Sequence, residues 1–302
     1  MKENWTETTQ WVSERWNLLW LEPSNGIALT FARRAVCLLA FGWLITFYLD
    51  SHWWYGAAGW NEAGFAKRLS LATDDVWPSR FRVTPLWMTS NPLVFKLCSG
   101  VGGLLSIAGF WGLGGRVTIA LLAGLVLFLT QRSMWLTGAF EPFLIACLGY
   151  LIIDSGSGSL LRAHTPAPPT RWTATLATRL LQVHTWLLVL FGLGYLLSGQ
   201  SWWRGEAVWW LAATDQAWLF DSEMLRGRIL LVNACTPLVV LSACFTLAFY
   251  WQPRFRLPTL ASGLLLAAAY LLLAGQAFYG MLLASMLLVS YLDPPGRAWP
   301  SK

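Results

Sequence analysis

The chain has 302 residues, of which 56% are hydrophobic and 12% are charged, and it contains 21 tryptophans. Ordinary soluble domains contain about 25% charged residues. The composition therefore excludes a soluble globular domain and indicates an all-α, polytopic membrane protein. The net charge of +6 does not indicate a nucleic-acid partner, because the lysines and arginines are scattered through short loops and never form a basic run. We expect membrane lipids as partners and no nucleic acid.

Residues 1–26 mix tryptophans with acidic and polar residues, which suits an amphipathic segment that lies in the membrane interface. They contain no apolar run of the length found in a cleaved signal peptide. The apolar run from Ile27 to Leu49 is long enough to cross the bilayer and predicts the first span. Arg33 and Arg34 mark the border of this run.

Residues 50–91 are rich in aromatic and charged side chains, so we expect a folded cap outside the lipid with a short helix near residues 61–71. The second to sixth spans are predicted at residues 93–111, 117–130, 134–153, 175–197 and 229–250. Small residues allow close helix packing. The glycines of the second span are therefore expected to face neighbouring helices: Gly100, Gly102, Gly103 and Gly109.

The apolar stretch 259–292 is too long for one upright helix and short for two full spans. We predict two short helices with a break around Gly275, Gln276 and Gly280, which gives about seven or eight transmembrane helices in total. A single transmembrane domain is expected over residues 27–293, with a four-span half (27–153), a hinge loop rich in Gly, Ser and Pro (154–174) and a C-terminal half (175–293). A short tail (294–302) follows, and the distribution of basic residues favours a cytoplasmic N-terminus.

Polar residues at membrane depth are functional candidates, because they are costly to bury. Arg132, Glu141, His184 and Gln276 qualify. Glu141 and His184 could form a proton-handling pair that faces a cavity, or they could serve as interhelical hydrogen-bonding groups. Asp74, beside Asp75, is either a catalytic acid in the long loop or part of an ordinary solvated loop. The catalytic candidates are therefore His184, Glu141 and Asp74.

The tryptophans occur near most helix borders, as in an interfacial belt, although they could also form a stacking platform for a quinone or a sugar. The five cysteines lie in apolar segments without the spacing of a metal or redox site, and no zinc-spaced histidine set is present. The sequence therefore predicts no metal site.

Several motifs occur in an order that resembles one family. Residues 31–48, FARRAVCLLAFGWLITFY, precede the aromatic-glycine segment WWYGAAGW. A Gly-Arg segment, a span, an arginine turn and an acid then follow in residues 113–154. The segment RLLQVHTWLLVLFGLGYLLSGQSWWRGEAVWW carries a glutamine-bearing helix and a tryptophan turn, and YLDP ends the last apolar run. Together these resemble the HTTM (horizontally transferred transmembrane) proteins, which are related to vitamin K-dependent gamma-carboxylase.

The resemblance implies a helical membrane domain and, by analogy, a quinone or vitamin K-like ligand. In the family pattern a lysine shortly before the tryptophan turn supplies the base for carboxylation. The matching positions here are Leu196 and Leu197, and no lysine occurs between Lys96 and Lys302. Carboxylase activity is therefore not expected.

Two functions remain open at this point. One is a non-carboxylating relative that binds a lipid or quinone-like ligand or acts as a membrane subunit. The other is a membrane-embedded enzyme that acts on a lipid or quinone substrate. The residues considered for ligand binding lie in the arginine turn and in the glutamine-bearing segment: Arg132, Gln182, His184, Trp202, Trp203 and Gly205.

Overall fold

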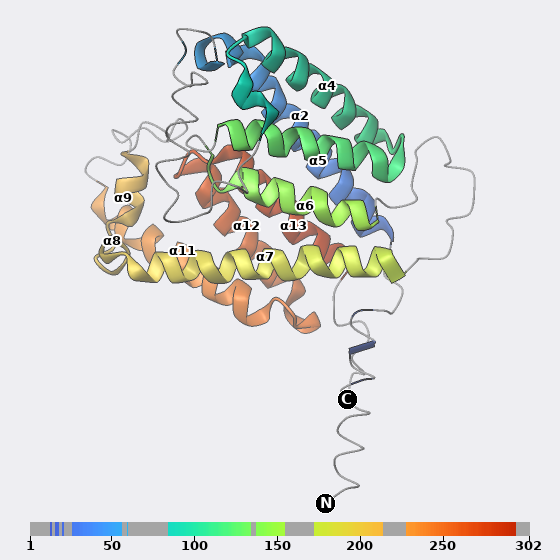
Figure 1. Ribbon diagram of the computed structural model, residues 1–302. Coiled ribbons are helices and arrows are strands. Elements are labelled where there is room, and N and C mark those ends of the chain that lie inside the picture. The colour runs from blue at the N-terminus through green and yellow to red at the C-terminus, as the bar shows by residue number, and fades with distance from the viewer. Residues whose placement is uncertain are drawn as a thin grey trace, which may run out of the picture. The chain divides into compact units, whose positions relative to one another are not determined.

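The computed structural model describes residues 26–55, 84–133, 137–154, 172–213 and 228–293, together with the isolated residues 13, 16, 17, 20 and 59. In this part of the chain every regular element is a helix (Figure 1). Six of these helices are long and apolar enough to cross a membrane, and two shorter apolar helices accompany them. The prediction of an all-α, multi-pass membrane protein is thus confirmed, and two of the predicted spans are shorter than a full crossing.

The chain divides into two compact units, residues 33–166 and residues 1–32 with 167–302. We call them the α2–α6 unit and the α7–α13 unit. The junction after residue 166 lies within the segment predicted as a hinge. The domain boundaries proposed from the sequence stay a prediction.

The α2–α6 unit contains most of α2 (Gly26–Tyr55), the short η2 (Pro85–Met88), α4 (Pro92–Trp111), α5 (Gly115–Arg132) and α6 (Phe140–Ile153). The side chain of Asn91 caps the start of α4, and Gly112 ends the helix in the left-handed conformation (φ 77°). The predicted second and third spans match α4 and α5 closely. Arg132, which follows the predicted third span, lies in the last turn of α5.

Glycines of α4 let α2 approach closely. A Cβ atom on Gly102 would lie 2.9 Å from Leu44, and one on Gly109 would lie 2.8 Å from the sulfur of Cys37. Gly103 of α4 faces Phe41 of α2. The predicted packing role is confirmed for these three positions. It is wrong for Gly100, where an added Cβ would meet nothing within 4 Å.

Helix α6 begins at Phe140, because Thr137, Gly138 and Ala139 are not helical. The prediction that the fourth span begins at residue 134 is therefore wrong in the described part, and Glu141 lies in the first turn of α6 rather than deep inside a span. Pro142 is compatible with this position, since the first turn of a helix needs no backbone N–H donor. The 14 residues of α6 correspond to about 21 Å, less than the roughly 30 Å of a hydrocarbon core.

The α7–α13 unit contains α7 (Trp172–Ser198), α11 (Ile229–Phe249), α12 (Arg256–Leu272) and the shorter apolar helix α13 (Ala277–Leu292). Shorter elements are α8 (Gln200–Trp203), α9 (Ala207–Ala212) and η5 (Pro253–Phe255). The predicted break in the last apolar stretch is confirmed between Leu272 and Ala277, where Gly275 has a φ of 64°. Gly280, predicted near the break, lies inside α13.

Some predictions lie outside the described residues. These are the short helix near residues 61–71, the acidic pair Asp74 and Asp75, the tail 294–302 and most of the amphipathic segment 1–26 and of the hinge 154–174.

Gly280 provides a test of the close packing between α12 and α13. A Cβ atom at this position would lie 2.7 Å from the carbonyl oxygen of Ala267 and 2.9 Å from the backbone nitrogen of Leu271. Backbone atoms cannot move aside by a change of rotamer, so Gly280→Ala is expected to lower the free energy of unfolding by about 1–3 kcal/mol. Gly194→Ala is the matched control, because its Cβ would meet nothing within 4 Å. Unfolding of both variants in detergent micelles measures the difference, and equal stabilities would contradict the packing.

Candidate functional site

A pocket of about 140 Å³ lies in the α2–α6 unit, between the C-terminal turns of α2 and the start of α6. We call it the α2–α6 pocket. Its walls carry aromatic rings, hydroxyl groups and two carboxylates, contributed by Thr46, Phe47, Asp50, Trp54, Tyr55, Ser133, Thr137 and Glu141. Thr46 and Asp50 are exposed, whereas Tyr55 and Ser133 are buried. The pocket therefore has an accessible acidic side and a buried hydroxyl-bearing side.

Glu141, a catalytic candidate from the sequence, lines this pocket with its carboxylate held in place. One carboxylate oxygen accepts a hydrogen bond from Nε1 of the buried Trp43 (3.1 Å), and the other accepts from the backbone N–H of Gly138 (2.8 Å). The position in the first turn of α6 also favours a negative charge through the helix dipole. A carboxylate has about four lone-pair sites. Glu141 therefore keeps the capacity to accept hydrogen bonds from a ligand.

The buried side of the pocket is fixed by Tyr55. Its ring stacks on Phe95 with the centroids 4.0 Å apart, and its hydroxyl is hydrogen bonded to Ser133, the residue that caps α5. The guanidinium of Arg132 lies 5.7 Å from the centroid of the Tyr55 ring and 5.8 Å from that of Phe95. Arg132, a ligand-binding candidate from the sequence, is 1% exposed and thus supports the pocket wall from behind.

The α7–α13 unit holds a second polar cluster, around Gln182. Its side-chain oxygen accepts a hydrogen bond from Arg179 (2.8 Å), and its side-chain nitrogen donates to the backbone oxygen of Asp293 (2.6 Å). Arg179 also lies 3.9 Å from a carboxylate oxygen of Asp293. The hydroxyl of Tyr250 donates to the backbone oxygen of Gln182. This cluster ties the N-terminal half of α7 to the residues that end α11 and α13.

His184 is half-buried on α7. It belongs to the α7–α13 unit, whereas Glu141 belongs to the α2–α6 unit, so the proposed proton-handling pair stays a prediction. Gln276 lies exposed in the break between α12 and α13.

The tryptophan turn, residues 202–205, is hydrogen bonded to α11. Gly205 adopts a φ of 77°, and its carbonyl accepts a hydrogen bond from the hydroxyl of Thr236 (2.9 Å). Trp203 is 73% exposed and donates from its indole nitrogen to the backbone oxygen of Leu197. Trp202 is partly buried. The three candidates Trp202, Trp203 and Gly205 thus lie together in one short segment, and none of them lines the α2–α6 pocket.

Comparison of the chain with protein-family models, with curated proteins and with solved structures found no match.

Sequence reasoning missed residues that line the pocket, and it missed Trp43, which donates a hydrogen bond to Glu141. Trp43, Asp50, Tyr55 and Ser133 lie in or beside apolar runs, and nothing in their spacing links them to Glu141. The one available signal was the adjacency of Ser133 to Arg132, a polar pair at the end of a predicted span.

The contact between Trp43 and Glu141 can be measured with a double-mutant cycle. Trp43→Phe removes the indole donor and Glu141→Ala removes its acceptor, so the two substitutions are expected to be coupled by about 1 kcal/mol in the free energy of unfolding. The matched control combines Glu141→Ala with Trp186→Phe, because the indole of Trp186 donates to the backbone oxygen of Leu247 instead. The control pair should be additive. Coupling no larger than that of the control pair would contradict the hydrogen bond.

Proposed function

We propose that this multi-pass membrane protein binds the ring-bearing head group of a lipid-soluble quinol in the α2–α6 pocket. The observation that carries the proposal is the combination of aromatic walls and carboxylate acceptors around a cavity of about 140 Å³. An apolar cavity of about 150 Å³ holds a benzene ring. The α2–α6 pocket therefore has room for one substituted ring, and the tail of the ligand would remain in the lipid.

The lining favours the reduced form of such a ligand. A quinol carries hydroxyl groups that can donate hydrogen bonds, and Glu141 and Asp50 are acceptors when ionised. An oxidised quinone offers only carbonyl oxygens, which would face these carboxylates without gaining a hydrogen bond from them. Phe47, Trp54 and Tyr55 supply aromatic surface for the ring. Discrimination between the two redox states is thus an expected property of this pocket.

Membership of the HTTM family is part of the same proposal, and it rests on the order of the sequence motifs. Carboxylation is not part of it. Leu196 and Leu197 occupy the positions where the family pattern has its lysine, and a leucine side chain cannot accept a proton. Both residues lie in the last turns of α7, and Leu196 is buried.

A second candidate function is an enzyme that acts on a lipid or quinol substrate. It is favoured by the carboxylate of Glu141, which lines the pocket and could accept a proton from a hydroxyl group of the substrate. In that case a Glu141→Gln variant would lose turnover while it still bound the ligand through the remaining walls.

Binding can be tested with the purified full-length protein in detergent micelles and with decylubiquinol and decylubiquinone as probes. Tryptophan fluorescence quenching measures the affinity for each. The quinol is expected to bind more tightly than the quinone, and Glu141→Gln is expected to weaken quinol binding about tenfold, because a hydrogen bond to a charged acceptor is lost.

Thr46→Leu provides a second variant, because it fills part of the pocket and leaves both carboxylates in place. It should weaken the binding of both probes. Glu206→Gln is the matched control, since Glu206 is exposed beside the tryptophan turn and does not line the pocket. The proposal would be ruled out if the unmodified protein bound decylubiquinol and decylubiquinone with equal affinity and Glu141→Gln changed neither affinity.

A further inference from the structure

Two hydroxyl groups, those of Tyr55 and Ser133, lie on the buried side of the α2–α6 pocket. Both residues line the pocket, each is 1% exposed, and their hydroxyl oxygens are hydrogen bonded to each other. The pair has two hydroxyl hydrogens, and the bond between the two residues uses one of them. Whichever residue donates within the pair, the other keeps an O–H hydrogen that can be donated. The pair can therefore act as a donor, whereas the ionised carboxylates of Asp50 and Glu141 can only accept.

The Tyr55–Ser133 pair is held in place from two helices. Tyr55 is the last residue of α2, and its ring lies between the stacked ring of Phe95 and the guanidinium of Arg132. Ser133 caps the end of α5, where its backbone N–H closes the last turn of that helix. A ligand that bonds to this pair would find both hydroxyl groups already ordered, which lowers the entropic cost of binding.

Glu141 and the Tyr55–Ser133 pair contact opposite ends of one row of aromatic side chains on α2. Glu141 accepts a hydrogen bond from Trp43, and Ser133 is bonded to Tyr55. Phe47 lies between them in the row, because its ring centroid is 4.4 Å from that of Trp43 and 6.1 Å from that of Tyr55. Phe47 itself lines the pocket. A ring bound against Phe47 would therefore have the carboxylate toward one edge and the hydroxyl pair toward the opposite edge.

We propose that the Tyr55–Ser133 pair binds the second ring oxygen of the quinol, an inference that rests on the proposed function of the pocket. The two hydroxyl groups of a para-quinol leave the ring at opposite edges. One of them can donate to Glu141, while the oxygen of the other accepts the hydrogen that the pair has left. A ring with a single hydroxyl group can satisfy only one of these two ends. The pair therefore makes the pocket selective for rings that carry two opposed oxygens.

The two ends of the pocket thus read different properties of the ligand. The carboxylate of Glu141 needs a donor, so it distinguishes a quinol from a quinone. The Tyr55–Ser133 pair offers a donor, so a hydroxyl oxygen and a carbonyl oxygen serve it equally well. Selectivity for the redox state and selectivity for the number of ring oxygens therefore depend on different residues and can be measured separately.

The number of ring oxygens can be tested on the unmodified full-length protein in detergent micelles, with tryptophan fluorescence quenching as the readout. The probes are decylhydroquinone and the two decylphenols that each lack one of its hydroxyl groups. Decylhydroquinone is expected to bind about fivefold more tightly than either phenol, because each phenol forgoes one hydrogen bond between neutral groups. This comparison needs no substitution, and equal affinities for the three probes would overturn the proposal.

The role of the pair is tested with the double variant Tyr55→Phe/Ser133→Ala. Removal of both hydroxyl groups together leaves neither of them buried without its partner, so the stability should change little. Decylhydroquinone binding should weaken about fivefold, to the level of the phenols, because the second hydrogen bond is lost. The affinity for the phenols should change less than about twofold, since their single hydroxyl group binds at Glu141 instead.

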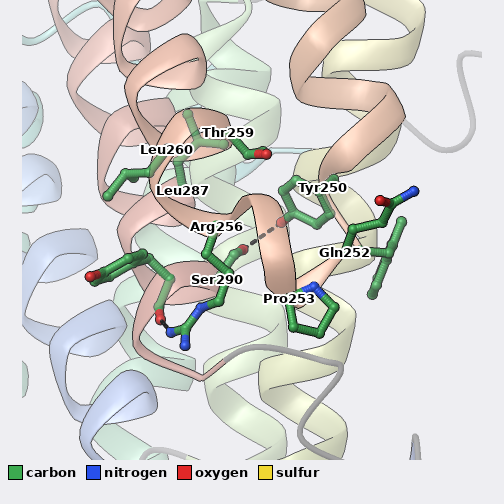
Figure 2. Close-up of a pocket in the computed structure, with 10 residues that line it drawn as sticks. Tyr250, Gln252, Pro253, Arg256, Thr259, Leu260, Leu287 and Ser290 are labelled. Carbon is green, nitrogen blue, oxygen red and sulfur yellow. Dashed lines mark hydrogen bonds between the residues drawn. The ribbon is translucent and has the colours of Figure 1, made fainter. Parts of the chain in front are cut away.

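Tyr250→Phe/Ser290→Ala is the matched control. The hydroxyl groups of Tyr250 and Ser290 are hydrogen bonded to each other beside a smaller cavity in the α7–α13 unit, and neither residue lines the α2–α6 pocket (Figure 2). The control removes the same two groups and should leave the affinity for decylhydroquinone unchanged. Equal losses in the two double variants, or equal weakening of decylhydroquinone and the phenols in Tyr55→Phe/Ser133→Ala, would overturn the role of the pair.

Failure of this inference differs from failure of the proposed function. Decylhydroquinone binding that depends on Glu141 but is unchanged in Tyr55→Phe/Ser133→Ala would overturn the second contact alone. Binding that is insensitive to Glu141→Gln, or no binding of decylhydroquinone at all, would overturn the quinol site together with the role of the pair.

Discussion

Polar groups inside apolar helices must find partners within the chain, because hydrocarbon offers no hydrogen bonds. Three arginines that are at most 6% exposed illustrate this constraint: Arg33, Arg132 and Arg179. Arg33 lies against the turn at Gly112, where a Cβ atom would be 3.1 Å from its guanidinium. Arg132 lies over two aromatic rings, and Arg179 bonds to a glutamine and to the end of α13. Each arginine thereby fixes a helix end or a turn.

The α2–α6 pocket lies at helix ends, where backbone groups lose their intrahelical partners and charged side chains can be accommodated. The charged residues that line it are Asp50 and Glu141. Carboxylates accept hydrogen bonds, so the pocket suits a ligand that donates them.

The helices could be predicted because a span must be long enough to cross the bilayer and apolar enough to stay in it, and both properties can be read from the sequence. The span expected at residues 229–250 matches α11 (Ile229–Phe249), and the left-handed Gly275 marks the break before α13. The start of α6 could not be predicted in this way. The apolar run continues through Gly138 and Ala139 although neither is helical, so hydropathy alone placed Glu141 inside a span.

The sequence could not show which residues the site residues contact. Hydropathy gives the depth of a residue but not the side of the helix on which it lies, and Trp43 stands 98 residues from Glu141. The contacts in the structure distinguish two of the candidates, Gln182 and Glu141. The side chain of Gln182 is fully buried between Arg179 and Asp293 and does not line the α2–α6 pocket, so a ligand has no room to reach it there. Glu141 lines a cavity and retains lone pairs, so it can bind a ligand without giving up the contacts that hold it. For that reason Glu141, rather than the glutamine of the most recognisable motif, is the residue on which ligand binding should depend.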